Sequence, residues 1–144
     1  LQAKLKKTTR LILGNVADTV PTFMETNTSP VGFAAFDLDF YSSTVHAMKI
    51  LSADHDRLLP RTYCYFDDTM GSMEELYNEF TGELLAIREF NEKHEARKIA
   101  LIHGLIQNRI IKSKWCNAMY ALHVFDHPLY NRYIPDRQNH APFD

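Results

Sequence analysis

Two pairs of aspartates that follow apolar segments are the residues of this sequence best suited to chemistry. Asp37 and Asp39 come directly after VGFAAF, and Asp67 and Asp68 come directly after YCYF. Carboxylates that are brought together repel one another and resist losing water, and a bound cation is the simplest remedy. Because oxygen ligands favour hard ions, the two pairs predict a site for Mg²⁺.

The apolar segments before the aspartates are expected to be buried strands that place both pairs at one edge of a sheet. Val31–Phe36 and Tyr63–Phe66 are nearly continuous apolar runs, which is typical of strands covered on both faces. In an open parallel sheet, ligands bind beyond the carboxyl ends of the strands. A lone aspartate there commonly caps a helix or begins a turn, but two pairs after two such strands favour a functional site.

The remaining segments predict an α/β fold in a single domain spanning residues 1–144. This length suits one domain with its own core. Strands alternate with helices at first, so the first strands should be parallel, while the last two strands should form an antiparallel pair at one edge. The expected elements are a strand at 10–16, a helix after Ser42 or Ser43, a helix from Ser72 to about Asn91, and strands at 98–103 and 119–125.

Composition and charge exclude several classes of function. The formal net charge is −2, from 16 basic and 18 acidic residues, which argues against a general nucleic-acid binder with a basic face. No segment approaches the run of about 18 apolar residues that predicts a membrane span, and no signal peptide is recognisable. The two cysteines, Cys64 and Cys116, form no disulfide framework. The sequence therefore predicts a cytoplasmic protein without a membrane or nucleic-acid partner.

Three other residues are weaker candidates for a site. His123 and His127 are four positions apart and would share one face of a strand. A metal pair is one interpretation, but an ordinary strand end is favoured. Cys64 lies inside an apolar segment, where we expect a small hydrophobic residue rather than a nucleophile.

Two longer segments, FDLDFYSSTVHAMKIL and LLPRTYCYFDD, resemble the macrocin O-methyltransferase-like group of class I S-adenosylmethionine-dependent methyltransferases. That group carries a D-x-D-x-Y-x-S-T-like segment after its fourth strand, then a helix, then a fifth strand that ends in a D-D pair. The segment LILGNVADTVPTF resembles the third strand of the family and the loop after it. The resemblance covers about Leu11 to Met70 and implies a Rossmann-like class I methyltransferase sheet, mostly parallel with an antiparallel C-terminal strand pair.

The resemblance also implies a role for each matched residue. Asp37 would be a metal ligand and the catalytic residue that helps to deprotonate an acceptor hydroxyl. Asp67 and Asp68 would complete the Mg²⁺ site, and Asp39 and Tyr41 would line the substrate pocket. Since Mg²⁺ lowers the pKa of a bound hydroxyl, the implied reaction is metal-assisted transfer of a methyl group from S-adenosylmethionine to a hydroxyl of a small molecule such as a sugar.

The sequence departs from the family pattern in two places. The Pro-Gly-Gly-like turn before the fifth strand is represented only by Pro60. The glycine-rich turn and the acidic residue that hold the cofactor have no counterpart, and Gly14 comes too late in the order to supply them. We therefore expect the C-terminal portion of a methyltransferase domain that lacks the glycine-rich first-strand region, with cofactor-binding residues that remain unknown.

Two alternatives stay open beside the methyltransferase. The DLD segment also resembles Mg²⁺-dependent phosphatases of the haloacid dehalogenase type, although Phe40 and Tyr41 replace the small residue and threonine of that family and the second acidic pair follows too soon. The other alternative is a non-catalytic Rossmann-like module that binds a partner protein. Self-association as a homo-oligomer is compatible with all three.

Overall fold

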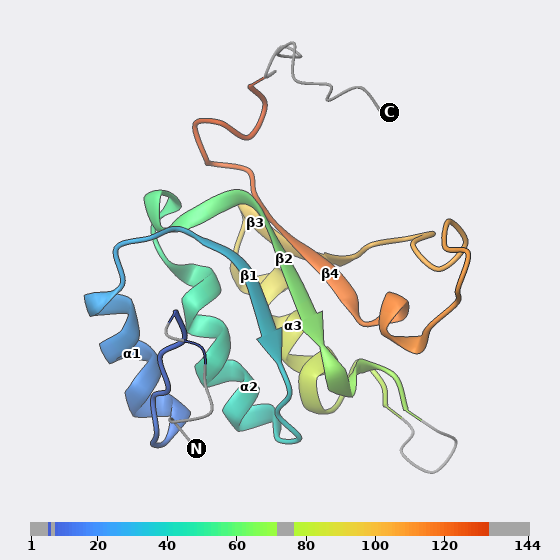
Figure 1. Ribbon diagram of the computed structural model, residues 1–144, viewed down its shortest axis with the longest axis horizontal. Coiled ribbons are helices and arrows are strands. Elements are labelled where there is room, and N and C mark those ends of the chain that lie inside the picture. Colours follow the sequence, from blue (N-terminus) through green and yellow to red (C-terminus); the bar gives the residue numbers. More distant parts are fainter. Residues whose placement is uncertain (1–5, 7, 72–76, 133–144) are drawn as a thin grey trace.

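A four-stranded mixed sheet forms the centre of the computed structural model, which describes residues 6, 8–71 and 77–132. The strands are β1 (Val31–Phe36), β2 (Leu58–Phe66), β3 (Arg97–Leu101) and β4 (Met119–Val124). They lie in the order β1-β2-β4-β3 (Figure 1). β1 and β2 are parallel, and β4 is antiparallel to both of its neighbours. The expected α/β class, parallel first pair and antiparallel last pair are confirmed.

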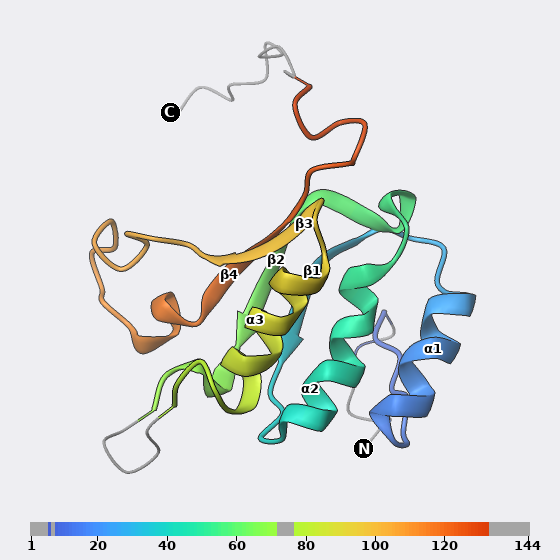
Figure 2. The ribbon, with the colours of Figure 1, turned by 180° about the vertical axis from the view of Figure 1, so that it is seen from behind.

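The helices gather on one side of the sheet. α2 (Tyr41–Ala47), which continues as a 3₁₀ helix over Met48–Ser52, and α3 (Gly82–Lys93) cover one face, and α1 (Val16–Thr26) lies beside α2 (Figure 2). No described segment covers the opposite face of β1 and β2, where Phe33 is 57% exposed. The expectation that both strands are buried on two faces is therefore wrong for the described chain.

The core lies between the sheet and the helices. Successive side chains of a strand point to opposite faces, so alternate residues of β2 and β4 enter the core. The rings of Phe36 and Phe66 stack with centroids 4.6 Å apart, and Tyr120 packs edge-on against Phe66. Leu122 and Val124 are fully buried beside them. This packing fixes the carboxyl ends of β1 and β2 next to each other.

The expected strand at residues 10–16 is wrong. Residues 10–15 form no strand, and α1 begins at Val16. The side chain of Asn15 caps this helix by accepting the N–H of Ala17 at 2.9 Å. An apolar run this short needs a partner strand, and none pairs with it in the described chain, so the helix-capping signal decides the local structure.

The long helix expected from Ser72 begins later, at Gly82. Residues 77–81 are not helical, and 72–76 lie outside the described residues. Gly82 has a φ of +53°, a left-handed conformation that a continuous right-handed helix does not contain. The second half of the expected apolar stripe is confirmed, because Ile87 and Phe90 are buried. Within the described residues, no helix is long and apolar enough to cross a membrane.

Candidate functional site

The two aspartate pairs lie at the same edge of the sheet. β1 and β2 are parallel neighbours, and their last residues, Phe36 and Phe66, pair in register. Asp37 follows the first of these strands directly, and Asp67 and Asp68 begin a short 3₁₀ turn after the second. The parallel pairing that the sequence predicted therefore brings the pairs together.

The charges of these aspartates act on one another. Partial burial of Asp68 raises the pKa of its carboxyl group, and the negative charges of Asp39, Asp67 and Asp37 raise it further. The hydroxyl of Tyr77 opposes this rise by donating to Asp68 Oδ1 at 3.1 Å. The other oxygen, Oδ2, is buried and has no hydrogen-bond partner. Asp68 is thus the least exposed of the four aspartates.

Glu83 is a fifth carboxyl group in the cluster, and sequence reasoning missed it. It is the second residue of α3 and is 0% exposed. Its Oε2 accepts the backbone N–H of Asp68 at 2.9 Å, while Oε1 is buried without a partner. Burial raises the pKa of Glu83 to about 8, against the lowering effect of hydrogen bonds from the backbone of Asp68 and Leu38. Glu83 therefore holds its proton at neutral pH.

A local signal for Glu83 was present in the sequence. The expected helix began at Ser72, which placed Glu83 in mid-helix. The actual helix starts after Thr81. Threonine is a preferred residue before the first helical position, and an acidic residue in the first turn interacts favourably with the helix dipole. The segment Thr81-Gly82-Glu83 therefore carried a sequence signal for the start of a helix.

Tyr65 also joins the cluster, from the open face of the sheet. Its hydroxyl donates a hydrogen bond to Asp67 Oδ1. This bond is the main cause that raises the pKa of Tyr65 to about 12, with smaller contributions from burial and from the charges of Asp67, Asp37 and Glu83. One carboxylate oxygen of Asp67 is therefore hydrogen-bonded to the Tyr65 hydroxyl.

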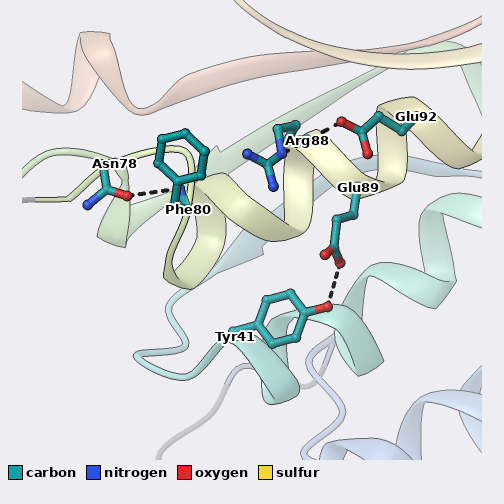
Figure 3. A network of polar contacts seen from close by, with 6 residues as sticks. All are labelled: Tyr41, Asn78, Phe80, Arg88, Glu89 and Glu92. Carbon is teal, nitrogen blue, oxygen red and sulfur yellow. Dashed lines mark hydrogen bonds and ion pairs between the residues drawn. The ribbon is translucent and has the colours of Figure 1, made fainter.

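Tyr41 was expected to line the substrate pocket. It is the first residue of α2, and its hydroxyl donates to Glu89 on α3 (Figure 3). On the same stretch of α3, Arg88 pairs with Glu92 at 3.7 Å and lies over the ring of Phe80, 4.9 Å from its centroid. The Tyr41 hydroxyl is thus engaged in a contact between helices.

A groove leads to Asp37 along the outer edge of the sheet. Its volume is about 680 Å³, and it is lined by β1, by residues of α1 and by Asp37 itself. The lining is mainly apolar, from residues such as Val20, Phe23 and Ala35. Concave sites with an apolar wall and a few polar groups are typical of small-molecule binding, and this groove places one carboxylate at such a wall.

The expected Mg²⁺ site was tested against this geometry. The carboxylates supply the oxygen donors that a hard cation prefers, and Asp68 and Glu83 each leave one buried oxygen without a partner. However, among the residues that the structure describes, no group of three or more His, Cys, Asp or Glu is placed to hold a metal ion. The arrangement does not fit a metal centre, and Mg²⁺ binding by Asp37, Asp67 and Asp68 stays a prediction.

The remaining candidates have ordinary surroundings. His123 Nδ1 lies 2.7 Å from the hydroxyl of Tyr130, whereas His127 Nδ1 accepts the N–H of Leu129 at 3.0 Å. The two histidines therefore have separate hydrogen-bond partners. Burial raises the pKa of the Cys64 thiol to about 12, which suits a buried hydrophobic residue and not a nucleophile.

Comparison with known proteins adds no relative. No protein-family model matches the chain, no curated protein sequence matches it, and no solved structure matches its fold. The candidate functional site therefore rests on the geometry of this chain alone. It consists of the groove and the neighbouring cluster of carboxyl groups, Asp37, Asp39, Asp67, Asp68 and Glu83.

Proposed function

We propose that the protein transfers a methyl group from S-adenosylmethionine to a hydroxyl of a small molecule, and that Asp37 helps to remove the hydroxyl proton. The observation that carries this proposal is the meeting of both aspartate pairs beyond the carboxyl ends of two adjacent parallel strands, where the charges of Asp37, Asp39 and Asp67 act on Asp68. Ligands of open α/β sheets bind in this position.

The sheet gives further support. The strands β1, β2 and β3 run in one direction and the last strand runs against them, which agrees with the closing part of the sheet that the methyltransferase resemblance implies. A Rossmann-like fold for the whole domain is part of the proposal.

The chemistry asked of this chain is modest. Bound S-adenosylmethionine would supply an electrophilic methyl group. Asp37 is exposed and lines the groove, so its carboxylate can accept the proton of a hydroxyl placed there. As the bond from the acceptor oxygen to the methyl carbon forms, the bond from that carbon to the sulfonium sulfur breaks.

The test uses the complete gene product, with calorimetry for S-adenosylmethionine and a labelled-methyl assay on a panel of sugars and other small alcohols. Both are run with added Mg²⁺ and with a chelator. We expect binding and transfer, and we expect Asp37→Asn to lower transfer about 100-fold or more while cofactor affinity stays within about threefold. Asp54→Asn is the matched control, because Asp54 is exposed and precedes the other end of β2.

Three results would separate the alternatives. A protein that neither binds S-adenosylmethionine nor transfers its methyl group under any of these conditions would overturn the proposal. Hydrolysis of a generic phosphate ester, lost in Asp37→Asn, would assign the site to the DxD-type phosphatases instead. Loss of transfer on chelation, restored by Mg²⁺, would establish the metal dependence that the sequence suggested.

A further inference from the structure

The loop between β3 and β4, residues 102–118, carries two consecutive exposed isoleucines. Ile110 is fully exposed and Ile111 is 83% exposed, which makes them the two most exposed large apolar side chains of the described chain. The loop projects from the sheet on the side away from α1 and α2 (Figures 1 and 2). Single exposed apolar side chains are ordinary, but an adjacent pair on a projecting loop indicates contact with an apolar partner.

The loop is anchored at its base and across its two limbs. At the base, the N–H of Phe66 donates to the carbonyl of Ala118 at 3.0 Å, and Cys116 is 1% exposed. Further out, the guanidinium of Arg109 lies over the ring of Trp115, 4.8 Å from its centroid. This cation–π contact joins the two ends of segment 109–115. The two isoleucines therefore lie between residues that contact each other.

The charges of the loop all have one sign. Arg109, Lys112 and Lys114 are exposed, and residues 102–118 contain no Asp or Glu, although the whole chain has a formal net charge of −2. An anionic lipid surface attracts basic residues, and each Lys or Arg near it is worth about fivefold in affinity. The indole ring of Trp115 suits the boundary between lipid headgroups and hydrocarbon. The segment thus combines apolar, basic and aromatic side chains in one exposed place.

We propose that residues 109–115 bind the surface of a lipid bilayer that contains anionic lipids, with Ile110 and Ile111 among the acyl chains and the basic side chains against the phosphate groups. Binding of this kind scales with the buried apolar area and with the attraction to anionic lipid, and the segment offers both. The inference goes beyond methyl transfer and is independent of it.

A bilayer fits this surface better than other partners of basic segments do. Single-stranded nucleic acids stack their bases on aromatic rings and offer no apolar seat for two adjacent isoleucines. A protein partner would need an apolar pocket lined by acidic residues, whereas a bilayer accepts a projecting apolar pair without a matching shape. The sequence argued against a membrane partner because no segment is long enough to span one, but a loop that enters one leaflet does not need such a segment.

The experiment uses the only tryptophan of the chain, Trp115, as a reporter inside the proposed surface. The complete gene product is titrated with vesicles of phosphatidylcholine containing about 30% phosphatidylserine, and with vesicles of phosphatidylcholine alone. We expect a blue shift of the emission with the anionic vesicles, quenching when their lipids carry brominated acyl chains, and binding that is at least about tenfold weaker without phosphatidylserine. Added salt should weaken the binding, because it screens the charges.

Two double variants separate the apolar and the basic contributions. Ile110→Ser with Ile111→Ser should lower affinity for the anionic vesicles about tenfold or more. Lys112→Gln with Lys114→Gln should lower it by a similar factor and leave binding to pure phosphatidylcholine unchanged. All four side chains are exposed, so thermal unfolding should stay as in wild type. Leu13→Ser, which changes an exposed apolar residue outside the loop, is the control and should bind as wild type does.

Three results would overturn the inference. One is failure of the wild-type protein to bind the anionic vesicles. Another is binding that the double isoleucine variant retains, or that leaves Trp115 unquenched by brominated lipid, because the membrane would then contact a different surface. The third is a dimer that the double isoleucine variant converts to a monomer while vesicles are not bound, since a second copy would then cover the two isoleucines. The vesicle assay contains no S-adenosylmethionine, so its outcome does not depend on whether the protein transfers a methyl group.

Discussion

Aromatic residues are buried on one face of the sheet and exposed on the other. On the face toward α2 and α3, Phe66 is 0% exposed and stacks on Phe36. On the other face, Phe33 and Tyr63 pair in register on the same two strands, yet they are 57% and 54% exposed. Figures 1 and 2 show these faces from opposite sides, with the helices in front only in the second. Residue type alone therefore does not decide burial here.

The difference shows that the apolar pattern of a strand does not determine which of its faces other segments cover. A continuous apolar run predicts a strand with two apolar faces, but the cover on each face comes from other segments. One face has its helices in the described chain and the other does not. Side chains on the first face should therefore determine stability, while those on the second should change it little.

The largest effect is expected from shortening Phe66. Phe66→Ala removes a fully buried ring at the centre of the core, and such changes cost about 3–5 kcal/mol of unfolding free energy. Phe33→Ala, at the paired strand on the open face, should cost less than about 1 kcal/mol. Urea unfolding followed by circular dichroism measures both. Similar losses in the two variants would show that something covers the open face in solution.

A titration of Glu83 should give the next largest effect, because it is a carboxyl group buried on the helix side. Burial raises its pKa from 4.5 to about 8. The folded state therefore keeps a proton that the unfolded state has lost between these pH values. Stability is full below about pH 4.5 and falls as the pH rises toward 8. Since each pKa unit corresponds to about 1.4 kcal/mol, the loss between pH 5 and pH 8 should be about 3–4 kcal/mol.

Glu83→Gln should remove this pH dependence, because glutamine does not ionise. As the pH rises from 5 to 8.5, wild type should lose this stability and Glu83→Gln should keep it. The difference in unfolding free energy between the two proteins should therefore shift in favour of Glu83→Gln by about the loss expected for wild type. Glu95→Gln, an exposed change just after the same helix, serves as the control. A constant difference between Glu83→Gln and wild type across this range would contradict the burial of an ionisable group at this position.

Much of the fold was predictable because it rests on local patterns. The strands around Ala34, Cys64, Ile99 and Leu122 were expected from apolar runs, and their parallel and antiparallel directions followed from the presence or absence of helices between them. The errors fall where a local signal competed with another. Asn15 capped a helix where an apolar run predicted a strand, and Gly82 interrupted a helical stripe that looked continuous.

The site was only partly predictable for a different reason. Asp37, Asp39, Asp67 and Asp68 were found because they follow strands directly, so topology alone gathers them. Glu83 reaches the cluster from α3, and its contribution depends on burial and on backbone contacts that have no fixed spacing in the sequence. The engagement of Tyr41 with Glu89 likewise depends on how two helices pack.

Two hydroxyl groups on β2, one buried and one exposed, should also differ in how much their hydrogen bonds contribute to stability. Thr62 faces the core, is 0% exposed and donates to the carbonyl of Val31 at 2.9 Å, where the register of β1 and β2 shifts. Thr62→Val leaves that carbonyl without this partner and should cost about 1–2 kcal/mol. Tyr65→Phe removes the exposed bond to Asp67, and water replaces it, so the cost should be below about 0.5 kcal/mol. Thermal unfolding of both variants tests the ranking, and a larger cost for Tyr65→Phe would reverse it.

The smallest effect on stability is expected from charging the open face. Phe33→Lys and Tyr63→Lys together should change the unfolding free energy by less than about 1 kcal/mol, because both side chains are already more than half exposed. The same change should remove an apolar patch, so native-state fluorescence of an apolar dye should fall by about half or more.

Ile12→Lys, which changes an exposed apolar residue outside the sheet, is the control and should leave most of the dye signal. An unchanged signal in the double variant, or a large loss of stability, would mean that the open face is occupied in solution. Either result would remove the contrast between the two faces, whereas the expected pair of results ties exposure, and not residue type, to the energetic difference.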